Sequence, residues 1–395
     1  MKIFSADKVF PVDAPSIAQG YVAIRDDGTI DTVGSQDNLP DTDIIKLRGW
    51  IIPGMVNAHC HLELSHLVGR VDTGTGLLPF LQKVVTLREV EESLILDAIT
   101  DQDTYMYDHG IVAVGDICNT THTHSTKIKS PIRYYSFVEM FDFMQQPMAQ
   151  ATFAKYKAVY DGHQADKKDK KSCVPHAPYT VSKDLYTAIN KVNSAEDTVS
   201  VHNQETPSEN ELFIEGTGGF HDFFSQFGFL YPEDVKTGKP SIYTLLNQMD
   251  RKCKTLFVHN TLTTESDIMA AHAWSDRVYW ATCPNANLYI ENRLPDYQVF
   301  KSTDATVCIG TDSLTSNWQL DVWEEVKTLL RYKSYLSAEE VIKWATLNGA
   351  EALSMDDQLG SITPGKKCGL VNITSTSKFE NRLDISRSEA RRIVV

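Results

Sequence analysis

Several features that mark particular classes of protein are absent from this 395-residue sequence. Its seven cysteines are scattered and odd in number and form no CxxC pair, so they indicate neither a disulfide framework nor a zinc ribbon. No run of about 18 apolar residues is present, and the opening residues MKIFSADKVF contain no apolar signal-peptide core. We therefore expect a cytoplasmic protein that does not span a membrane.

Positive charge is also scarce, because 38 basic residues face 52 acidic ones and the formal net charge is −14. Such an acidic balance argues against nucleic acid or an anionic membrane as the main partner. The hydrophobic share of 42% and the charged share of 23% are ordinary for a folded globular protein. The composition thus predicts a globular protein without nucleic-acid or membrane partners.

Three regions can be separated along the chain. Residues 1–50 consist of short strand-like runs, with a hairpin signal at Asp26-Asp27-Gly28. Residues 353–395 return to short strand-like runs such as GLVNITST. We expect the two ends, 1–50 and 353–395, to form one small β-sandwich lobe beside a larger domain over 51–352.

The larger domain alternates apolar strand-like runs with amphipathic helical patterns such as those over 77–99 and 321–333. Strands that alternate with helices predict parallel β/α units. Eight units predict an α/β fold of the (β/α)₈ TIM-barrel type. The eight runs are 50–61, 110–118, 131–140, 172–177, 198–203, 254–260, 277–283 and 305–312.

Histidines and an aspartate stand where these runs end, which is where barrels carry their functional side chains. The first run ends in His59-Cys60-His61, and residues two apart in a strand share a face. His202 ends the fifth run and Asp312 the eighth. Three imidazoles and one carboxylate make a donor set for zinc or iron(II). Taken singly, such a histidine is more often a core or surface residue, and Asp312 could cap the next helix.

Two further titratable residues lie at strand ends without an assigned ligand role. Glu205 follows His202 by three residues, and His259 ends the sixth run. A metal with an open coordination position activates water, and a neighbouring carboxylate can move the proton of that water to a substrate. Glu205 has the spacing for that transfer, while His259 could orient the nucleophile or polarise the attacked carbon. The predicted reaction is hydrolysis of a C–N bond or, as an alternative, of a C–Cl or C–O bond.

The sequence resembles the amidohydrolase superfamily, in particular its cytosine-deaminase-like and chlorohydrolase-like branch, over nearly the whole chain. The motifs that carry the resemblance are PGMVNAHCHL (53–62), HNQE (202–205), CPNAN (283–287), GTDS (310–313), ATLNGA (345–350) and GSITPGK (360–366). The resemblance implies that His59, His61, His202 and Asp312 ligate one divalent metal ion, Zn²⁺ in the first place and Fe²⁺ as an alternative. It also implies that Glu205 is the proton shuttle, that His259 and Asp312 act beside the water, and that the protein is a homo-oligomer.

The chain departs from the family pattern at two places. Ala286 stands where serine is usual, and Lys367-Cys368-Gly369-Leu370 replaces the usual sequence after Pro-Gly-Lys. Two-metal members of the superfamily place a carboxylated lysine at the end of the fourth strand. The corresponding run here ends in Pro175-His176-Ala177 with no lysine, so the resemblance implies a single metal.

The segment His61-Leu62-Glu63-Leu64-Ser65, with a helix ending near Arg88, looks like the aminodeoxyfutalosine-deaminase-like group. Those enzymes remove the 6-amino group of an adenine-type nucleoside. Glu63, Arg88 and His176 are therefore candidates for contacting a small-molecule substrate. The alternatives are a carboxylate that holds a ligand histidine for Glu63, a solvated helix face for Arg88, and a buried hydrogen-bonding role for His176.

Together these features favour a metal-dependent hydrolytic deaminase of an amino-substituted purine nucleoside or related heterocycle, which releases ammonia. The alternatives are a cyclic amide hydrolase, similar to imidazolonepropionase, or another C–N or C–Cl hydrolase of the same superfamily. A third reading is a non-catalytic scaffold, but scaffolds typically lose metal ligands and none is missing here.

Overall fold

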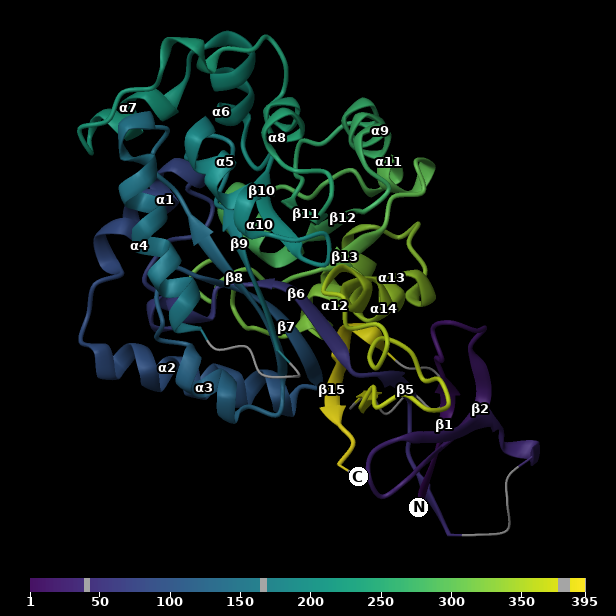
Figure 1. The fold of residues 1–395 in the computed structure, drawn as a ribbon. Coiled ribbons are helices and arrows are strands. Elements are labelled where there is room, and N and C mark those ends of the chain that lie inside the picture. Colours follow the sequence, from purple (N-terminus) through teal and green to yellow (C-terminus); the bar gives the residue numbers. More distant parts are fainter. Residues whose placement is uncertain (39–42, 164–168, 376–383, 395) are drawn as a thin grey trace.

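Three hydrogen-bonded sheets organise the chain in a computed structural model that describes residues 1–38, 43–163, 169–375 and 384–394 (Figure 1). One parallel four-stranded sheet contains β6 (Met55–Cys60), β7 (Ile111–Cys118), β8 (Arg133–Met140) and β9 (Lys170–Pro175). The other contains β10 (Thr198–Asn203), β11 (Lys254–His259), β12 (Val278–Thr282) and β13 (Val307–Ile309). Each predicted run overlaps one of these eight strands, so the predicted strand order is confirmed.

Hydrogen bonds join the two parallel sheets at both pairs of edges. The His202 N–H donates to the His176 carbonyl oxygen at 3.0 Å, which ties β10 to the end of β9. On the other side the N–H groups of Thr311 and Asp312 each donate to the His59 carbonyl oxygen at 3.0 Å, and Cys60 and Asp312 form a parallel bridge. The carboxyl ends of the first, fourth, fifth and eighth predicted strands are thereby brought together.

The first predicted run, 50–61, is two strands rather than one. Trp50–Pro53 forms β5 of the third sheet, and β6 begins at Met55. Gly54 makes the change of sheet, and a Cβ there would lie 2.2 Å from Val112 Cγ1 and 2.6 Å from the Cys368 oxygen. Both halves of the run are largely apolar, and the Pro53-Gly54 pair is the sequence signal that marks the change between them.

The third sheet has seven strands and draws on both ends of the chain. Its strands are β1 (Lys2–Val9), β2 (Ile17–Ile24), β3 (Ile30–Ser35), β4 (Ile44–Lys46), β5, β14 (Leu370–Ser375) and β15 (Ser388–Arg392). The described strands pair in the order β15-β14-β5-β1-β2-β3, with β4 also on β1. The sandwich form predicted for this lobe stays a prediction. Apolar side chains from both ends, including Phe4, Val22, Ile51 and Leu370, gather into one cluster.

The helices follow the strands in the order expected of β/α units (Figure 1). They are α1 (Leu77–Leu87), α2 (Glu92–Asp108), α3 (His124–Lys129), α4 (Ala149–Gly162), α5 (Lys183–Val192), α6 (Pro207–Asn210), α7 (Gly219–Ser225), α8 (Ile242–Gln248), α9 (Glu265–Trp274), α10 (Pro284–Glu291), α11 (Tyr297–Ser302), α12 (Val322–Tyr332), α13 (Ala338–Ala345) and α14 (Leu347–Ala352). None of these helices of the described chain is both long and apolar enough to cross a membrane.

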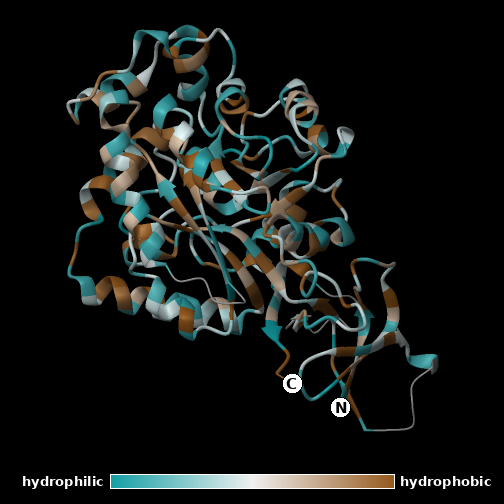
Figure 2. Cartoon of the chain, in the orientation of Figure 1, coloured by the Kyte–Doolittle hydropathy of each residue, from teal (hydrophilic) through white to brown (hydrophobic). Residues whose placement is uncertain are grey.

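The distribution of buried residues agrees with this arrangement of strands and helices. Every residue of β7 is buried, as expected for a strand of a parallel sheet that is covered on both faces. Helices such as α2 show alternating hydrophobic and hydrophilic bands (Figure 2).

The pattern over 321–333 forms α12, whose first turn is capped by the Asp321 carboxylate accepting from the Trp323 N–H at 2.8 Å. The pattern over 77–99 is divided between α1 and α2, because the helix ends where the Arg88 carbonyl pairs with the His66 ring at 3.1 Å.

Candidate metal centre and cavity

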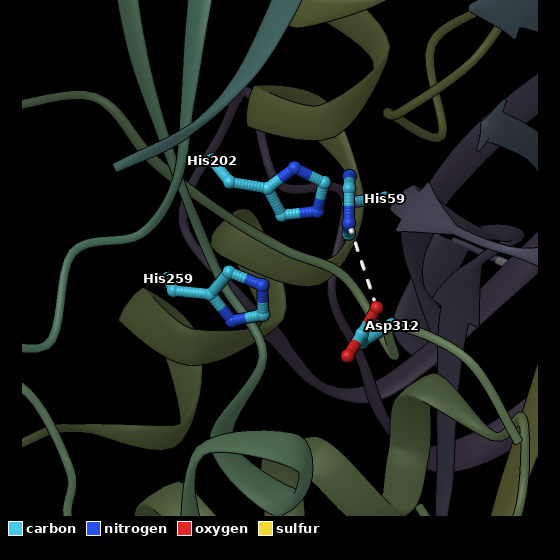
Figure 3. A group of neighbouring side chains, drawn as sticks. All are labelled: His59, His202, His259 and Asp312. Atoms are coloured by element: carbon cyan, nitrogen blue, oxygen red, sulfur yellow. Dashed lines mark ion pairs between the residues drawn. The ribbon is translucent and has the colours of Figure 1, made fainter. Parts of the chain in front are cut away.

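Three imidazoles and one carboxylate converge at the carboxyl ends of β6, β10 and β13. His61 Nε2 lies 3.2 Å from His59 Nε2 and 3.3 Å from His202 Nε2. Asp312 Oδ1 lies 3.3 Å from His61 Nε2 and 3.7 Å from His59 Nε2. All four residues are buried. Figure 3 shows His59, His202 and Asp312 pointing toward one another, with the His59–Asp312 pair marked.

These spacings fit a metal ion. Two ligand atoms 2.0–2.1 Å from zinc at the tetrahedral angle lie about 3.3 Å from each other, and the measured separations are 3.2–3.7 Å. His202 also has the tautomer that ligation needs. Its Nδ1 pairs with the His176 carbonyl oxygen at 2.8 Å, and since a carbonyl can only accept, Nδ1 carries the hydrogen and Nε2 presents a lone pair.

The electrostatics of the cluster match the ligand forms of these residues. Burial lowers the pKa values of His61 and His202 and takes that of His59 to about 4, so all three rings are neutral near pH 7. Burial alone would raise the pKa of Asp312, but the nearby histidines hold it well below its ordinary value. Neutral imidazoles and an ionised carboxylate are the species that bind a divalent cation.

Close approach of β13 to β6 fixes the position of Asp312. A Cβ on Gly310 would lie 2.8 Å from both the Cβ and the carbonyl oxygen of His59, so only glycine fits there. Asp312 then adopts the left-handed region, with φ of 59°. Its Oδ2 accepts a hydrogen bond from Ser316 Oγ at 2.5 Å, which leaves Oδ1 toward the imidazoles.

His259 and Glu205 form a buried pair beside this cluster. His259 Nε2 lies 2.9 Å from Glu205 Oε1, and its Nδ1 lies 2.9 Å from the side-chain oxygen of Asn287. Both ring nitrogens therefore donate. Burial opposes protonation of His259, but the Glu205 carboxylate raises its pKa to about 9. A donor atom of His259 also lies within 4.8 Å of donor atoms of His59, His202 and Asp312, but since both its nitrogens are occupied, His61 is the better ligand candidate.

A buried ion pair that the sequence did not reveal supports the first strand of the site. Lys127 Nζ lies 2.5 Å from Asp116 Oδ2, and both side chains are buried. Asp116 Oδ1 accepts from the Leu62 N–H at 2.8 Å, directly after His61. Lys127 also donates to Ser136 Oγ at 2.9 Å. The pair thus holds the backbone from which the His61 ring projects.

An apolar cavity opens onto the candidate metal cluster. Its wall includes His61, His202, Glu205, His259 and Asp312, together with Arg88, Asn119, Glu139, His176, Tyr179, Thr180 and Ser313. Aliphatic and aromatic side chains complete it, namely Leu64, Leu77, Phe80, Leu81, Val84, Val85, Phe141, Phe143, Phe223, Phe224 and Ile290. A mostly apolar wall with a few convergent polar groups is typical of a small-molecule site. In the part of the chain that the structure describes, no lysine lines this cavity.

The three predicted substrate contacts fall in different places. Arg88 and His176 line the cavity, and His176 also pairs through Nδ1 with Thr180 Oγ1 at 2.8 Å. Glu63 is absent from the cavity wall. Its carboxylate accepts from the N–H groups of Asn119 and Thr120, both at 3.1 Å. Arg88 Nη2 reaches Glu63 at 3.4 Å, so Glu63 holds Arg88 and the loop after β7 instead.

Sequence reasoning missed two buried carboxylates of the site. Glu139 ends β8 and lines the cavity, and the strand-end rule applied to the run 131–140 would have found it. Glu209 accepts from the N–H groups of Gln204 and Glu205, both at 3.0 Å, and from the Ser241 hydroxyl. It lies in the short helix α6, where no motif singled it out.

The fold and the histidine–aspartate cluster define a hydrolase built around a divalent metal site at strand ends. Residues 50–385 match the Amidohydrolase family, so the chain belongs to that family and the resemblance inferred from its motifs is confirmed.

Among its relatives, an adenosine deaminase of Helicobacter pylori is 27% identical over 340 residues, which cover 83% of this chain and 80% of that protein. An aminodeoxyfutalosine deaminase of Nitratiruptor sp. is 27% identical over 393 residues, 96% of this chain and 93% of that protein. The crystal structure of the Helicobacter pylori aminofutalosine deaminase in complex with methylthio-coformycin shares the fold, with a TM-score of 0.80, 21% identity and full coverage of both chains.

Proposed function

We propose that this protein is a metal-dependent hydrolytic deaminase that removes the amino group of an adenine-type nucleoside as ammonia. The convergence of the donor atoms of His59, His61, His202 and Asp312 at 3.2–3.7 Å, beside the Glu205–His259 pair, carries the proposal. The names of the full-length relatives support the reaction and the substrate class. The apolar cavity is suited to a purine ring.

His59, His61, His202 and Asp312 are proposed to hold one divalent ion. Imidazole and carboxylate donors favour zinc, with Fe²⁺ as the alternative. The absence of lysine from the described cavity wall supports a single ion. When bound, such an ion supplies the Lewis acidity that makes water a nucleophile near neutral pH.

The chain's own residues are proposed to handle the protons. Glu205 takes one proton from the attacking water and delivers it to the leaving nitrogen, so that a C–O bond forms as the C–N bond breaks. His259 donates through Nε2 to Glu205 Oε1 and holds that carboxylate at the cavity wall. Asp312 stays ionised beside the reacting centre.

Two structural proposals accompany the activity. The two parallel sheets are the halves of one closed (β/α)₈ barrel over 51–352, which their hydrogen bonds at both junctions support. The two chain ends, 1–50 and 353–395, form the smaller lobe.

All seven cysteines are buried and unpaired, which supports the cytoplasm as the compartment. Assembly as a homo-oligomer stays a prediction that light scattering would test.

Ammonia release from the zinc-loaded protein tests the proposed activity. The panel is aminodeoxyfutalosine, adenosine, methylthioadenosine, S-adenosylhomocysteine, guanine and cytosine. We expect turnover of at least one adenine nucleoside and none in the Glu205→Gln variant, which keeps its metal because Glu205 is not a proposed ligand. No ammonia from any of the panel, or a new carboxylate product instead, would reject the deaminase.

A further inference from the structure

Glu139 presents a buried carboxylate oxygen that no described residue satisfies with a hydrogen bond. The side chain ends β8, is 3% exposed and lines the cavity. Its Oε2 accepts from Asn119 Nδ2 at 3.1 Å, but its Oε1 has no hydrogen-bond partner. His202 Nδ1 lies 3.6 Å from Oε1, and its hydrogen is directed to the His176 carbonyl oxygen. A buried carboxylate oxygen without a partner is costly.

Among the described residues, no other buried carboxylate oxygen near the cavity lacks a hydrogen-bond partner. Glu63 accepts from two backbone N–H groups, the Thr120 hydroxyl and Arg88. Glu209 accepts from two backbone N–H groups and the Ser241 hydroxyl. Glu205 is paired with His259 and Asp312 with Ser316. The open oxygen of Glu139 is therefore suited to a hydrogen-bond donor that arrives with a ligand.

The chemistry of the proposed substrate limits which donor that is. The ring nitrogens of an adenine nucleoside that carry no hydrogen are acceptors, and its amino group is the group that leaves at the metal centre. The donors that remain are the hydroxyl groups of the sugar. In its ionised form the Glu139 carboxylate can only accept, so that form pairs with a hydroxyl and not with a bare ring nitrogen.

We propose that Glu139 is a specificity-determining residue whose Oε1 accepts a hydrogen bond from a sugar hydroxyl of the nucleoside. This inference rests on the proposed function, since it names the part of the substrate that faces β8. Asn119 is the positioning residue, because its Nδ2 donates both to Oε2 and to the Glu139 backbone oxygen at 3.2 Å. The protein should accordingly prefer ribosides over analogues that lack the contacted hydroxyl.

Binding to a variant that cannot turn over tests the inference without relying on activity. In the zinc-loaded Glu205→Gln protein, calorimetry gives Kd for adenosine, 2′-deoxyadenosine and 3′-deoxyadenosine. A hydrogen bond to a charged group contributes about 1.5–3 kcal/mol, so the analogue without the contacted hydroxyl should bind roughly 10- to 150-fold more weakly. Adding Glu139→Leu should bring the three Kd values within about threefold, because leucine has no group that pairs with a hydroxyl.

Leucine is the informative replacement. An amide would direct its oxygen to Asn119 Nδ2 and its NH₂ group to the Oε1 position, where it could still donate to a hydroxyl oxygen. Glu139→Asp keeps the charge on a shorter side chain and should retain part of the discrimination. Glu325→Leu is the matched control, a buried carboxylate outside the cavity wall, and should leave the ratio of Kd values unchanged. Thermal unfolding shows that each variant is folded.

The outcomes separate this inference from the proposed function. Equal binding of the three nucleosides, or discrimination that survives Glu139→Leu in a folded variant, overturns the role of Glu139 even if the wild-type protein releases ammonia. Discrimination that depends on Glu139 supports the role even if no ammonia is released, in which case the deaminase is rejected. Failure to bind any of the three nucleosides rejects the role of Glu139, while the deaminase is still decided by ammonia release from the panel.

Discussion

Replacing Lys127 with methionine removes the ammonium group that neutralises Asp116 inside the protein. Asp116 is 0% exposed and its Oδ2 lies 2.5 Å from Lys127 Nζ. Breaking a buried ion pair on one side leaves an uncompensated charge and costs about 3–5 kcal/mol. Since the free energy of unfolding of a protein is about 5–15 kcal/mol, we expect Lys127→Met to lose a large fraction of its stability in urea.

The same substitution should weaken metal binding. Asp116 Oδ1 accepts from the Leu62 N–H at 2.8 Å, and Leu62 follows the proposed ligand His61. Loss of a group that orients a metal ligand typically costs about 10- to 100-fold in affinity. Zinc content after dialysis against a competing chelator measures this effect separately from unfolding.

Two controls make the reasoning refutable. Lys157→Met removes an exposed partner of Asp161, at 2.6 Å, and should cost well under about 1 kcal/mol. The double variant Asp116→Asn with Lys127→Met removes both charges and should be more stable than Lys127→Met alone, because no buried charge is left unpaired. If Lys127→Met unfolds within about 1 kcal/mol of the wild type, or if the double variant is the less stable of the two, the argument from the buried pair is wrong.

Four further outcomes follow from the site. Glu205→Gln should lower kcat by at least about 100-fold with full zinc content, because the proton shuttle is lost and no ligand is; zinc loss on metal analysis would contradict the assignment. His202→Ala and Asp312→Asn should both lose zinc, and retention in either removes that residue from the ligand set. Chelation should abolish turnover and lower the unfolding temperature, since an ion that binds only the folded state stabilises it; an unchanged melting curve would argue against a structural contribution. Burial raises the pKa of Glu325 to about 8 from an ordinary 4.5. Between these pH values the folded state holds a proton that the unfolded state has released. The free energy of unfolding therefore falls as pH rises from 4.5 to 8. The difference in free energy of unfolding between Glu325→Gln and the wild type should therefore shift in favour of the variant from pH 4.5 to pH 8. A difference that does not change with pH would refute the raised pKa of Glu325.

The candidate ligands were predictable because parallel strands in one β/α unit after another end at the same edge. His59 and His61 needed only the two-residue period of a strand, and their Nε2 atoms lie 3.2 Å apart. His202 and Asp312 needed the strand order, which the alternating pattern predicted. The close contact of Gly310 with His59 was not predictable, because it depends on how two strands distant in the sequence are packed.

The direction of the Glu63 side chain was not predictable, because the residue lies outside a regular helix or strand. Glu63 lies in a short helical turn, Leu62–Leu67, and its carboxylate is directed by backbone N–H groups after β7. Because Glu63 is close to His61 in the sequence, we predicted that it contacts the substrate. In the structure its carboxylate pairs with Arg88 and does not line the cavity.

Two carboxylates four residues apart illustrate how the fold assigns chemistry to like residues. Burial favours the neutral form of both Glu205 and Glu209. His259, 2.9 Å from Glu205, overcomes that effect and holds the pKa of Glu205 below its ordinary value. Glu209 has only neutral donors, so burial raises its pKa to about 7. Groups whose surroundings separate their pKa values take different roles. Glu205 faces the cavity as the proposed proton carrier. Glu209 fixes the backbone of Gln204, which has a left-handed φ of 49°, and so aims Glu205 at His259.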